Sequence, residues 1–143
     1  MPLRLLLCDD DLAIVRAAEF KLSRAGYEVE CAGDGQAGWE AIQRQRPDLL
    51  VTDCQMPRMT GLQLCEAVRG DAATRDLPII MLTAKGYELT EAEVRQRYGV
   101  LKLVAKPFSP RELLKSIDAV LRGDNPAPAC GESAQTIEPS VAS

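Results

Sequence analysis

Acidic residues, a threonine and a lysine follow the ends of four separate apolar stretches in this sequence. They are Asp9, Asp10, Asp53, Thr83 and Lys106. Two carboxylates about 4 Å apart repel each other by ~1 kcal/mol in water and by ~4 kcal/mol at an effective dielectric constant near 20. Acids that a fold brings this close therefore take up a proton or hold a cation. An ammonium group beside them can pair with an anion, so these residue types predict a site for a metal ion and an anionic group.

The chain has no histidine, and this limits both the cations that the site could bind and the reactions that it could catalyse. Without imidazole there is no Ser-His-Asp or Cys-His nucleophile, no histidine-bound zinc and no imidazole proton shuttle. Carboxylates are hard oxygen ligands, and Mg²⁺, or Mn²⁺, is the cation that a small set of such ligands suits best. Mg²⁺ also keeps several bound waters, which leaves coordination positions for phosphate oxygens.

Asp53 stands apart from the other acids and is the expected nucleophile. A carboxylate that attacks phosphorus forms an acyl phosphate, which is a recognised covalent route. A divalent cation and the Lys106 ammonium would spread the charge that develops on the phosphoryl oxygens. These residues therefore predict Mg²⁺-dependent phosphoryl transfer to Asp53.

Short apolar stretches alternate with helical patterns along most of the chain. Strands are expected at 3–8, 28–31, 48–52, 78–82 and 100–104. Helices are expected at 11–25, 35–46, 61–69, 89–98 and 110–121. Five β–α units in strict alternation predict an α/β fold with a doubly wound parallel sheet that has helices on both faces. Ligands of such sheets bind beyond the carboxyl ends of the strands, where the five candidate side chains would meet.

Single residues predict where several helices begin and which side they bury. Asp11, Thr90 and Ser109 are expected to cap the helices that follow them. The spacing of apolar residues in the first helix predicts a buried side made of Val15, Ala18, Leu22 and Ala25.

The composition changes at residue 124. Residues 124–143 contain three prolines, three acids and no lysine or arginine, so we expect a folded domain over 1–123 and a disordered C-terminal tail over 124–143.

The net charge of −4 argues against a nucleic-acid partner held by a basic face. The sequence shows neither a signal peptide nor an apolar stretch that could span a membrane, so we expect a cytoplasmic protein without a membrane partner. The five cysteines form no CxxC pair and are expected to be free thiols.

Four motifs, LLLCDDD, TDCQMPRMTG, MLTA and AKPF, occur in this order, and together they resemble the receiver domains of bacterial two-component response regulators. The resemblance covers about residues 3–122 and points to the chemotaxis-type regulators that consist of one domain. It implies a flavodoxin-like (βα)5 fold, with a five-stranded parallel sheet in the order 2-1-3-4-5. Residues 1–123 would then form the receiver, or phosphoacceptor, domain.

The resemblance also implies a role for each acid. Asp53 would accept a phosphoryl group from the phosphohistidine of a sensor histidine kinase or phosphotransfer protein. Mg²⁺ would be bound directly by Asp10, Asp53 and the backbone carbonyl of Gln55, and through water by Asp9. The domain would catalyse its own phosphorylation and dephosphorylation, without being an enzyme in the usual sense.

Three further residues would contact the phosphoryl group or respond to it. Thr83, with Ala84 beside it, would bind the group and move when it arrives, and Lys106 would pair with it. The resemblance further implies a cis bond between Lys106 and Pro107. Leu103 occupies the position where the family usually carries an aromatic residue that reports phosphorylation.

Two large polar residues lie at positions that set the lifetime of the phosphoryl group in this family. Gln55 is two residues after Asp53, and Lys85 is two residues after Thr83. Both are expected to contact or screen the site.

Three functions remain open on these residues. The first is a phosphorylation switch, a monomer or weak dimer, that signals to a protein target through the face formed by residues 89–121. The second is a receiver fold that docks partners whether or not it is phosphorylated, which Leu103 and the polar helix at 89–98 favour. The third is a Mg²⁺-dependent phosphatase with an aspartyl nucleophile. That class generally places the nucleophile after the first strand, whereas Asp53 follows the third.

Overall fold

The structure is a computed structural model that describes residues 3–56, 58–83 and 90–122 of the chain. Strands and helices alternate along these residues. The strands are β1 (Arg4–Cys8), β2 (Glu28–Ala32), β3 (Leu49–Asp53), β4 (Ile79–Thr83) and β5 (Lys102–Ala105). The helices are α1 (Leu12–Arg24), α2 (Gly35–Arg44), α3 (Gly61–Gly70), α4 (Glu91–Tyr98) and α5 (Pro110–Leu121). The expected alternation of five strands and five helices is therefore confirmed.

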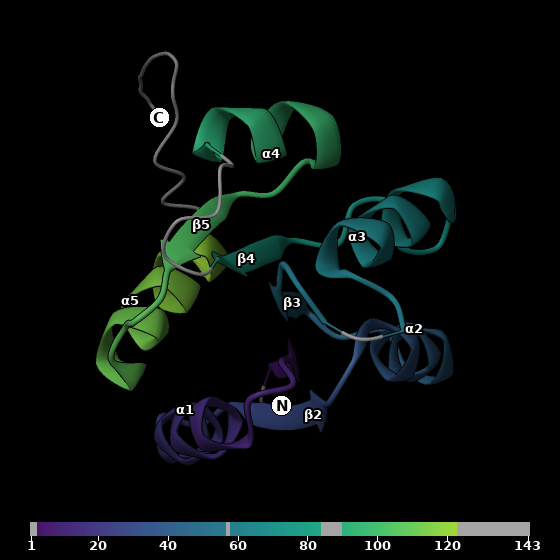
Figure 1. Ribbon diagram of the computed structural model, residues 1–143. Coiled ribbons are helices and arrows are strands. Elements are labelled where there is room, and N and C mark those ends of the chain that lie inside the picture. The colour runs from purple at the N-terminus through teal and green to yellow at the C-terminus, as the bar shows by residue number, and fades with distance from the viewer. Residues whose placement is uncertain (1–2, 57, 84–89, 123–143) are drawn as a thin grey trace.

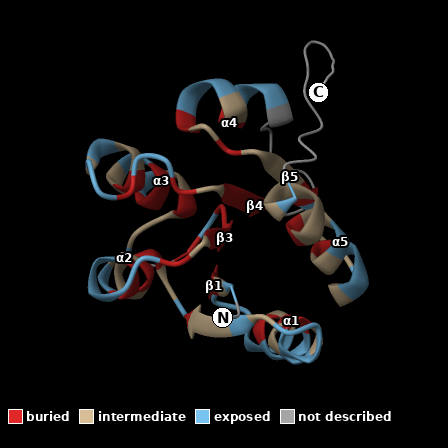
Figure 2. Cartoon of the chain, turned by 180° about the vertical axis from the view of Figure 1, so that it is seen from behind, coloured by how far each residue is buried: buried red, intermediate tan, exposed pale blue. Residues whose placement is uncertain are grey.

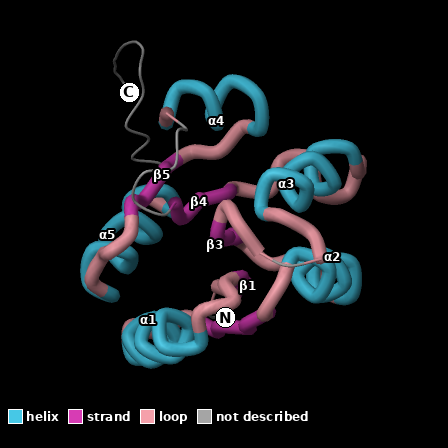
Figure 3. Tube along the Cα trace, in the orientation of Figure 1, coloured by secondary structure: helices cyan, strands magenta, loops and turns pink. Residues whose placement is uncertain are grey.

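The five strands form one parallel sheet in the order β2-β1-β3-β4-β5. Helices α1 and α5 lie on one face of this sheet, and α2, α3 and α4 lie on the other (Figure 1). The chain reverses its direction of travel across the sheet between β1 and β3, so the loops after these two strands lie side by side at one edge. This is the doubly wound, flavodoxin-like arrangement that the sequence predicts, and Figure 3 shows the strands enclosed between the two helical layers.

Two buried apolar clusters, one on each face, hold the helices to the sheet. Side chains along β1 alternate between them, because successive residues of a strand point to opposite faces. Leu5 and Leu7 join the cluster under α1 and α5, whereas Leu6 joins the cluster under α2, α3 and α4. Figure 2 shows the buried residues concentrated in the strands and on the inner sides of the helices.

The helix starts agree with the three capping predictions, but one predicted buried residue is exposed. Asp11 caps α1 and accepts hydrogen bonds from Ala13 N and Ile14 N, and Thr90 and Ser109 form capping boxes at α4 and α5. The prediction for Ala25 is wrong: this residue is exposed and is the C-cap of α1. The helix ends there, since the next residue, Gly26, has a left-handed φ of 102°.

Helix α2 comes close to the sheet at Gly38, since a Cβ there would lie 2.7 Å from Sγ of Cys8. The four described cysteines are free thiols, and Cys130 lies outside the described residues, as does the predicted tail. Every helix in the described ranges is too short or too polar to cross a membrane.

Candidate functional site

Three carboxylates meet at the carboxyl end of the sheet, and we call Asp9, Asp10 and Asp53 the acidic cluster. One oxygen from each of them lies within 4.8 Å of the others. Asp9 follows β1 directly and is fully buried, while Asp10 is exposed. Oδ1 of Asp9 accepts a hydrogen bond of 2.9 Å from Asp11 N, which fixes the carboxylate at the start of α1. The cluster thus faces solvent on the Asp10 side.

Asp53 is the last residue of β3, which lies between β1 and β4. Its side chain is almost fully buried, and Oδ1 accepts a hydrogen bond of 2.8 Å from Cys54 N. The loop between β3 and α3 is closed by a backbone hydrogen bond, in which the N–H of Gly61 donates to the Cys54 carbonyl at 3.0 Å. The sequence predicts Gly61 only as the start of a helix, and its close approach to Asp53 appears only in the structure.

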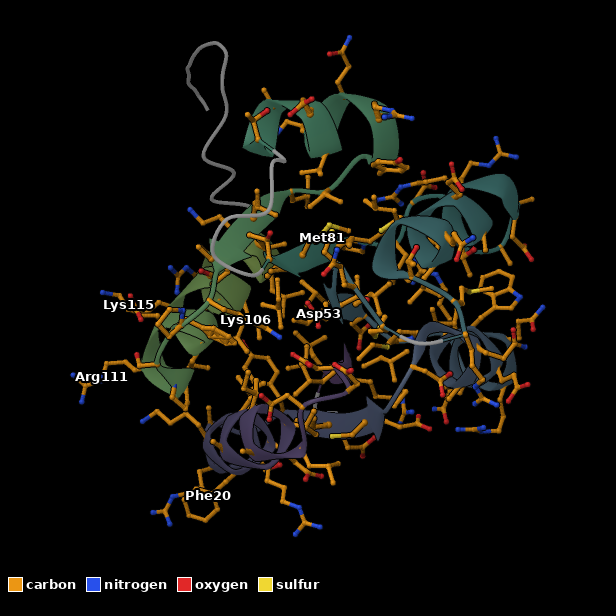
Figure 4. All side chains as sticks on the ribbon, viewed as in Figure 1. Phe20, Asp53, Met81, Lys106, Arg111 and Lys115 are labelled. Carbon is orange, nitrogen blue, oxygen red and sulfur yellow. The ribbon has the colours of Figure 1, made fainter. Side chains whose placement is uncertain are left out.

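Lys106 reaches the same site from the end of β5. Its Nζ lies 2.8 Å from Oδ2 of Asp9 and 3.2 Å from Oδ2 of Asp53, and Figure 4 shows it directed toward Asp53. The backbone N–H of Lys106 donates to the carbonyl of Thr83 at 2.7 Å, which holds the end of β5 beside β4. The bond between Lys106 and Pro107 is cis, as expected.

The other described candidate residues belong to β4, β5 and the loop after β3. Thr83 is the buried last residue of β4, one strand away from Asp53 in the sheet. Leu103 of β5 is half-buried and packs against the cluster under α2, α3 and α4. Gln55 is exposed in the loop after Asp53. Ala84 and Lys85 lie outside the described residues.

The sequence matches the response regulator receiver domain family over residues 5–118. This match covers β2 to β5, all of β1 except Arg4 and most of the final helix, and therefore every described candidate residue. The chain is a receiver domain.

Proteins similar to this receiver domain include response regulators and a receiver domain protein. It is 40% identical over 134 residues to the response regulator MprA of Mycolicibacterium vanbaalenii, an alignment that covers 94% of this chain and 57% of that protein. The structure of the chemotaxis response regulator CheY4 of Vibrio cholerae is 34% identical, with a TM-score of 0.77, over 84% of this chain and 99% of that one. The structure of a CheY-like receiver domain protein of Methanospirillum hungatei is 31% identical, with a TM-score of 0.76. This alignment covers 86% of this chain and 96% of that one. The chain spans about half the length of the curated relatives it matches.

Burial and neighbouring charges shift the pKa values of two side chains in the receiver site, Asp53 and Lys106. Burial and the charge of Asp9 raise the pKa of Asp53, although Lys106 and the Cys54 N–H act in the opposite direction. Burial alone would lower the pKa of Lys106, but the hydrogen bond and charge of Asp9, together with the charge of Asp53, raise it overall.

These two shifts have opposite consequences for stability. A carboxylate whose pKa is raised by folding holds its proton more tightly in the folded chain, so ionised Asp53 lowers the stability of the metal-free domain above that pKa. The stabilisation from Lys106 is fully present below its unfolded pKa and is lost only as pH rises through its raised folded pKa. In the metal-free site three carboxylates thus face the one ammonium of Lys106, which offsets their mutual repulsion only in part.

The acidic cluster fits a small divalent cation. Its donors are hard carboxylate oxygens, and Asp10 is exposed, so bound water can complete the coordination. Oδ2 of Asp9 is buried and faces the Lys106 ammonium at 2.8 Å. Asp9, Asp10 and Asp53 are therefore the side chains that could hold the metal.

Gly61→Ala is expected to destabilise the domain by about 3 kcal/mol or more, because overpacking against backbone forces the chain to shift. An ideal Cβ at this position would lie 1.9 Å from the carbonyl oxygen of Asp53. Gly70→Ala at the other end of α3 is the matched control, since no described atom lies within 4 Å of its Cβ. The control should change stability by less than ~1 kcal/mol. Urea unfolding followed by circular dichroism measures both, and equal stabilities of the two variants would contradict the close approach.

Proposed function

We propose that this receiver domain is a phosphorylation-dependent signalling switch in which Asp53 accepts a phosphoryl group from a partner histidine kinase or phosphotransfer protein. One observation carries the proposal: Asp53 shares a site with two further carboxylates and with the Lys106 ammonium, which lies 3.2 Å from its Oδ2. This combination suits the transfer of a dianionic group to a carboxylate, because cations must neutralise the charge of both reactants.

The transfer step follows from the positions of the Asp53 oxygens. A carboxylate oxygen attacks phosphorus, the N–P bond of the phosphohistidine breaks, and its electron pair returns to the imidazole nitrogen of the donor. Oδ1 is already bound by Cys54 N and Oδ2 faces Lys106, so both oxygens are oriented before the donor arrives. A bound Mg²⁺, or Mn²⁺, would supply charge neutralisation at the phosphoryl oxygens.

We assign the ligands of that ion to Asp10, Asp53 and the backbone carbonyl of Gln55, with Asp9 acting through water. Asp9 is the least suited to direct coordination, because its Oδ1 is held by Asp11 N and its Oδ2 by Lys106. This assignment leaves Lys106 free to transfer its contact from the carboxylates to the phosphoryl group.

The signal would leave the site through β4 and β5. Thr83 ends β4, and we propose that its hydroxyl, with Ala84, binds the phosphoryl group and moves toward it. Such a movement would alter the packing of Leu103 and so the α4–β5–α5 face, where a downstream protein target would bind. Gln55 and Lys85 would limit the access of water and so set the lifetime of the phosphorylated state. Residues 1–123 would act as one domain in this switch.

Incubation with Mg²⁺ and acetyl phosphate tests the proposal. The wild type should gain one hydroxylamine-labile phosphoryl group, with acetate leaving as the P–O bond breaks, and Asp53→Asn should gain none. Asp76→Asn, an exposed acid outside the site, should behave as the wild type. Intact-mass spectrometry measures the adduct, and labelling of Asp53→Asn equal to wild type would refute the proposed role. Rapid turnover of the donor without an adduct would indicate the phosphatase alternative.

A receiver fold that docks its partner independently of phosphorylation is the second candidate. The packing of Leu103 against the buried cluster favours it, because an aliphatic side chain takes the place of the aromatic reporter expected from the family. Partner affinity measured with and without acetyl phosphate separates the two functions. Equal affinity in both states would support docking alone, whereas the switch predicts a difference that Asp53→Asn abolishes.

A further inference from the structure

A shallow apolar groove runs between α1 and the start of α5, away from the acidic cluster. Its apolar lining comes from Ala13, Ala17, Phe20, Phe108 and Pro110. Phe20 is 65% exposed, and Figure 4 shows its ring pointing outward from α1. An aromatic side chain this exposed is unusual in a chain with few aromatics, and it indicates a surface that something covers.

The rim of this α1–α5 groove is basic. Lys21 and Arg111 line the groove, and a neighbouring hollow on α1 that shares Phe20 is lined by Arg16, Arg24 and the acid Glu19. The Arg24 guanidinium lies over the Phe20 ring at 5.5 Å from its centre, so charge and apolar surface form one patch. The groove therefore suits an acidic segment that also carries aliphatic side chains.

Residues 123–143 of the same chain have that composition. They contain three acids and no lysine or arginine. Ile137 and Val141 are their large aliphatic residues, and Glu138 lies directly beside the first of these. The rest of the chain contains 18 of the 21 acids and all 17 basic residues, so it is nearly neutral, and its basic groove is a local feature.

The chain leaves the described structure at the right place to reach the groove. The hydroxyl of Tyr27 donates a hydrogen bond to Asp118, which ties the last turns of α5 to the residues just after α1. The described chain therefore ends, at Arg122, near the C-terminal end of α1. Helix α1 has 13 residues and is about 20 Å long. A random coil of 15 residues, which is the number from 122 to 137, has a similar end-to-end distance of roughly 20 Å.

We propose that residues 123–143 bind in the α1–α5 groove of their own domain, with Ile137 and Val141 against Phe20 and the acids beside the basic rim. The segment needs no helix or strand of its own to do so. Because the tether gives an effective concentration of about 1 mM, a Kd of about 1 mM already keeps the groove occupied about half of the time. A partner that binds through Phe20 must displace the segment, which makes the segment a competitor for this face.

A nitroxide spin label on Cys130 of the full chain tests the proposal. Cys8, Cys54 and Cys65 are buried, and Cys31 is replaced by serine, so the label reports residues 123–143. Amide resonances of Ala17 and Phe20 should broaden, whereas those of Glu66 on α3, on the opposite face, should not. Phe20→Ser should weaken docking about tenfold and Arg111→Glu about threefold. Arg75→Glu, an exposed basic residue outside the groove, is the matched control and should leave the broadening unchanged.

Three results would overturn the proposal: no broadening on α1, broadening that survives both groove variants, or broadening that increases with protein concentration. The last would show that the groove binds a second copy. The measurement uses unphosphorylated protein, so its outcome is independent of whether Asp53 accepts a phosphoryl group.

Discussion

Replacing Lys106 with methionine is expected to slow phosphoryl transfer from acetyl phosphate to Asp53 by about 100-fold or more, the usual effect of removing a cation or donor from a developing anion. The same change should tighten Mg²⁺ binding by about tenfold or more. The reason is that the ammonium lies 2.8 Å from Asp9 and 3.2 Å from Asp53, and so competes with the metal for the same carboxylates. The two effects have opposite signs, which an unfolded variant cannot produce.

Lys115→Met is the matched control for this prediction. Lys115 is an exposed lysine of α5, and Figure 4 shows it pointing away from Asp53. Its variant should retain both the labelling rate and the Mg²⁺ affinity of the wild type. Stopped-flow labelling and isothermal titration calorimetry give the two values. Parallel losses of rate and affinity in Lys106→Met would mean that the lysine only supports the fold.

Asp10→Asn is expected to weaken Mg²⁺ binding by at least about 10-fold, since it removes a charged ligand from the acidic cluster. The adjacent residue provides a closely matched control. Asp11→Asn removes the same charge one position away, but Asp11 acts as the N-cap of α1, a role that asparagine fills equally well. Its affinity should stay within about twofold of wild type, because an exposed charge outside the cluster acts on the ion only through screened solvent.

Isothermal titration of both variants under the same ionic strength decides between a specific site and general negative charge. If Asp10→Asn and Asp11→Asn lose affinity equally, the metal responds to the local charge density rather than to the acidic cluster.

The sequence predicted the fold because apolar stretches and helical patterns alternate without exception along residues 3–122. A strand of a parallel sheet covered on both faces is buried throughout and mainly apolar, as β3 and β4 are, so its position is easily found. Helix ends were less certain where they depend on the path of the backbone. The exposure of Ala25 follows from the positive φ of Gly26, which helical spacing does not reveal.

The sequence predicts which residues form the acidic cluster, but it does not predict which of them pairs with Lys106. Strand order places the ends of β1, β3 and β5 at one edge, yet nothing in the spacing indicates that Lys106 pairs more closely with Asp9 than with Asp53. The contact of Gly61 with the Asp53 backbone and the groove beside Phe20 likewise depend on how separate elements pack. A glycine in a turn and an aromatic in a helix have many other roles, so the sequence alone could not assign these.

A crystal structure with Mg²⁺ and beryllium fluoride, an analogue of the phosphoryl group, tests the central claim most directly. The account predicts the fluoride group bound to an Asp53 oxygen, the ion held by Asp10 and Asp53, and the Lys106 ammonium moved onto a fluorine. A fluoride group elsewhere, or an ion that leaves these carboxylates unoccupied, would contradict it.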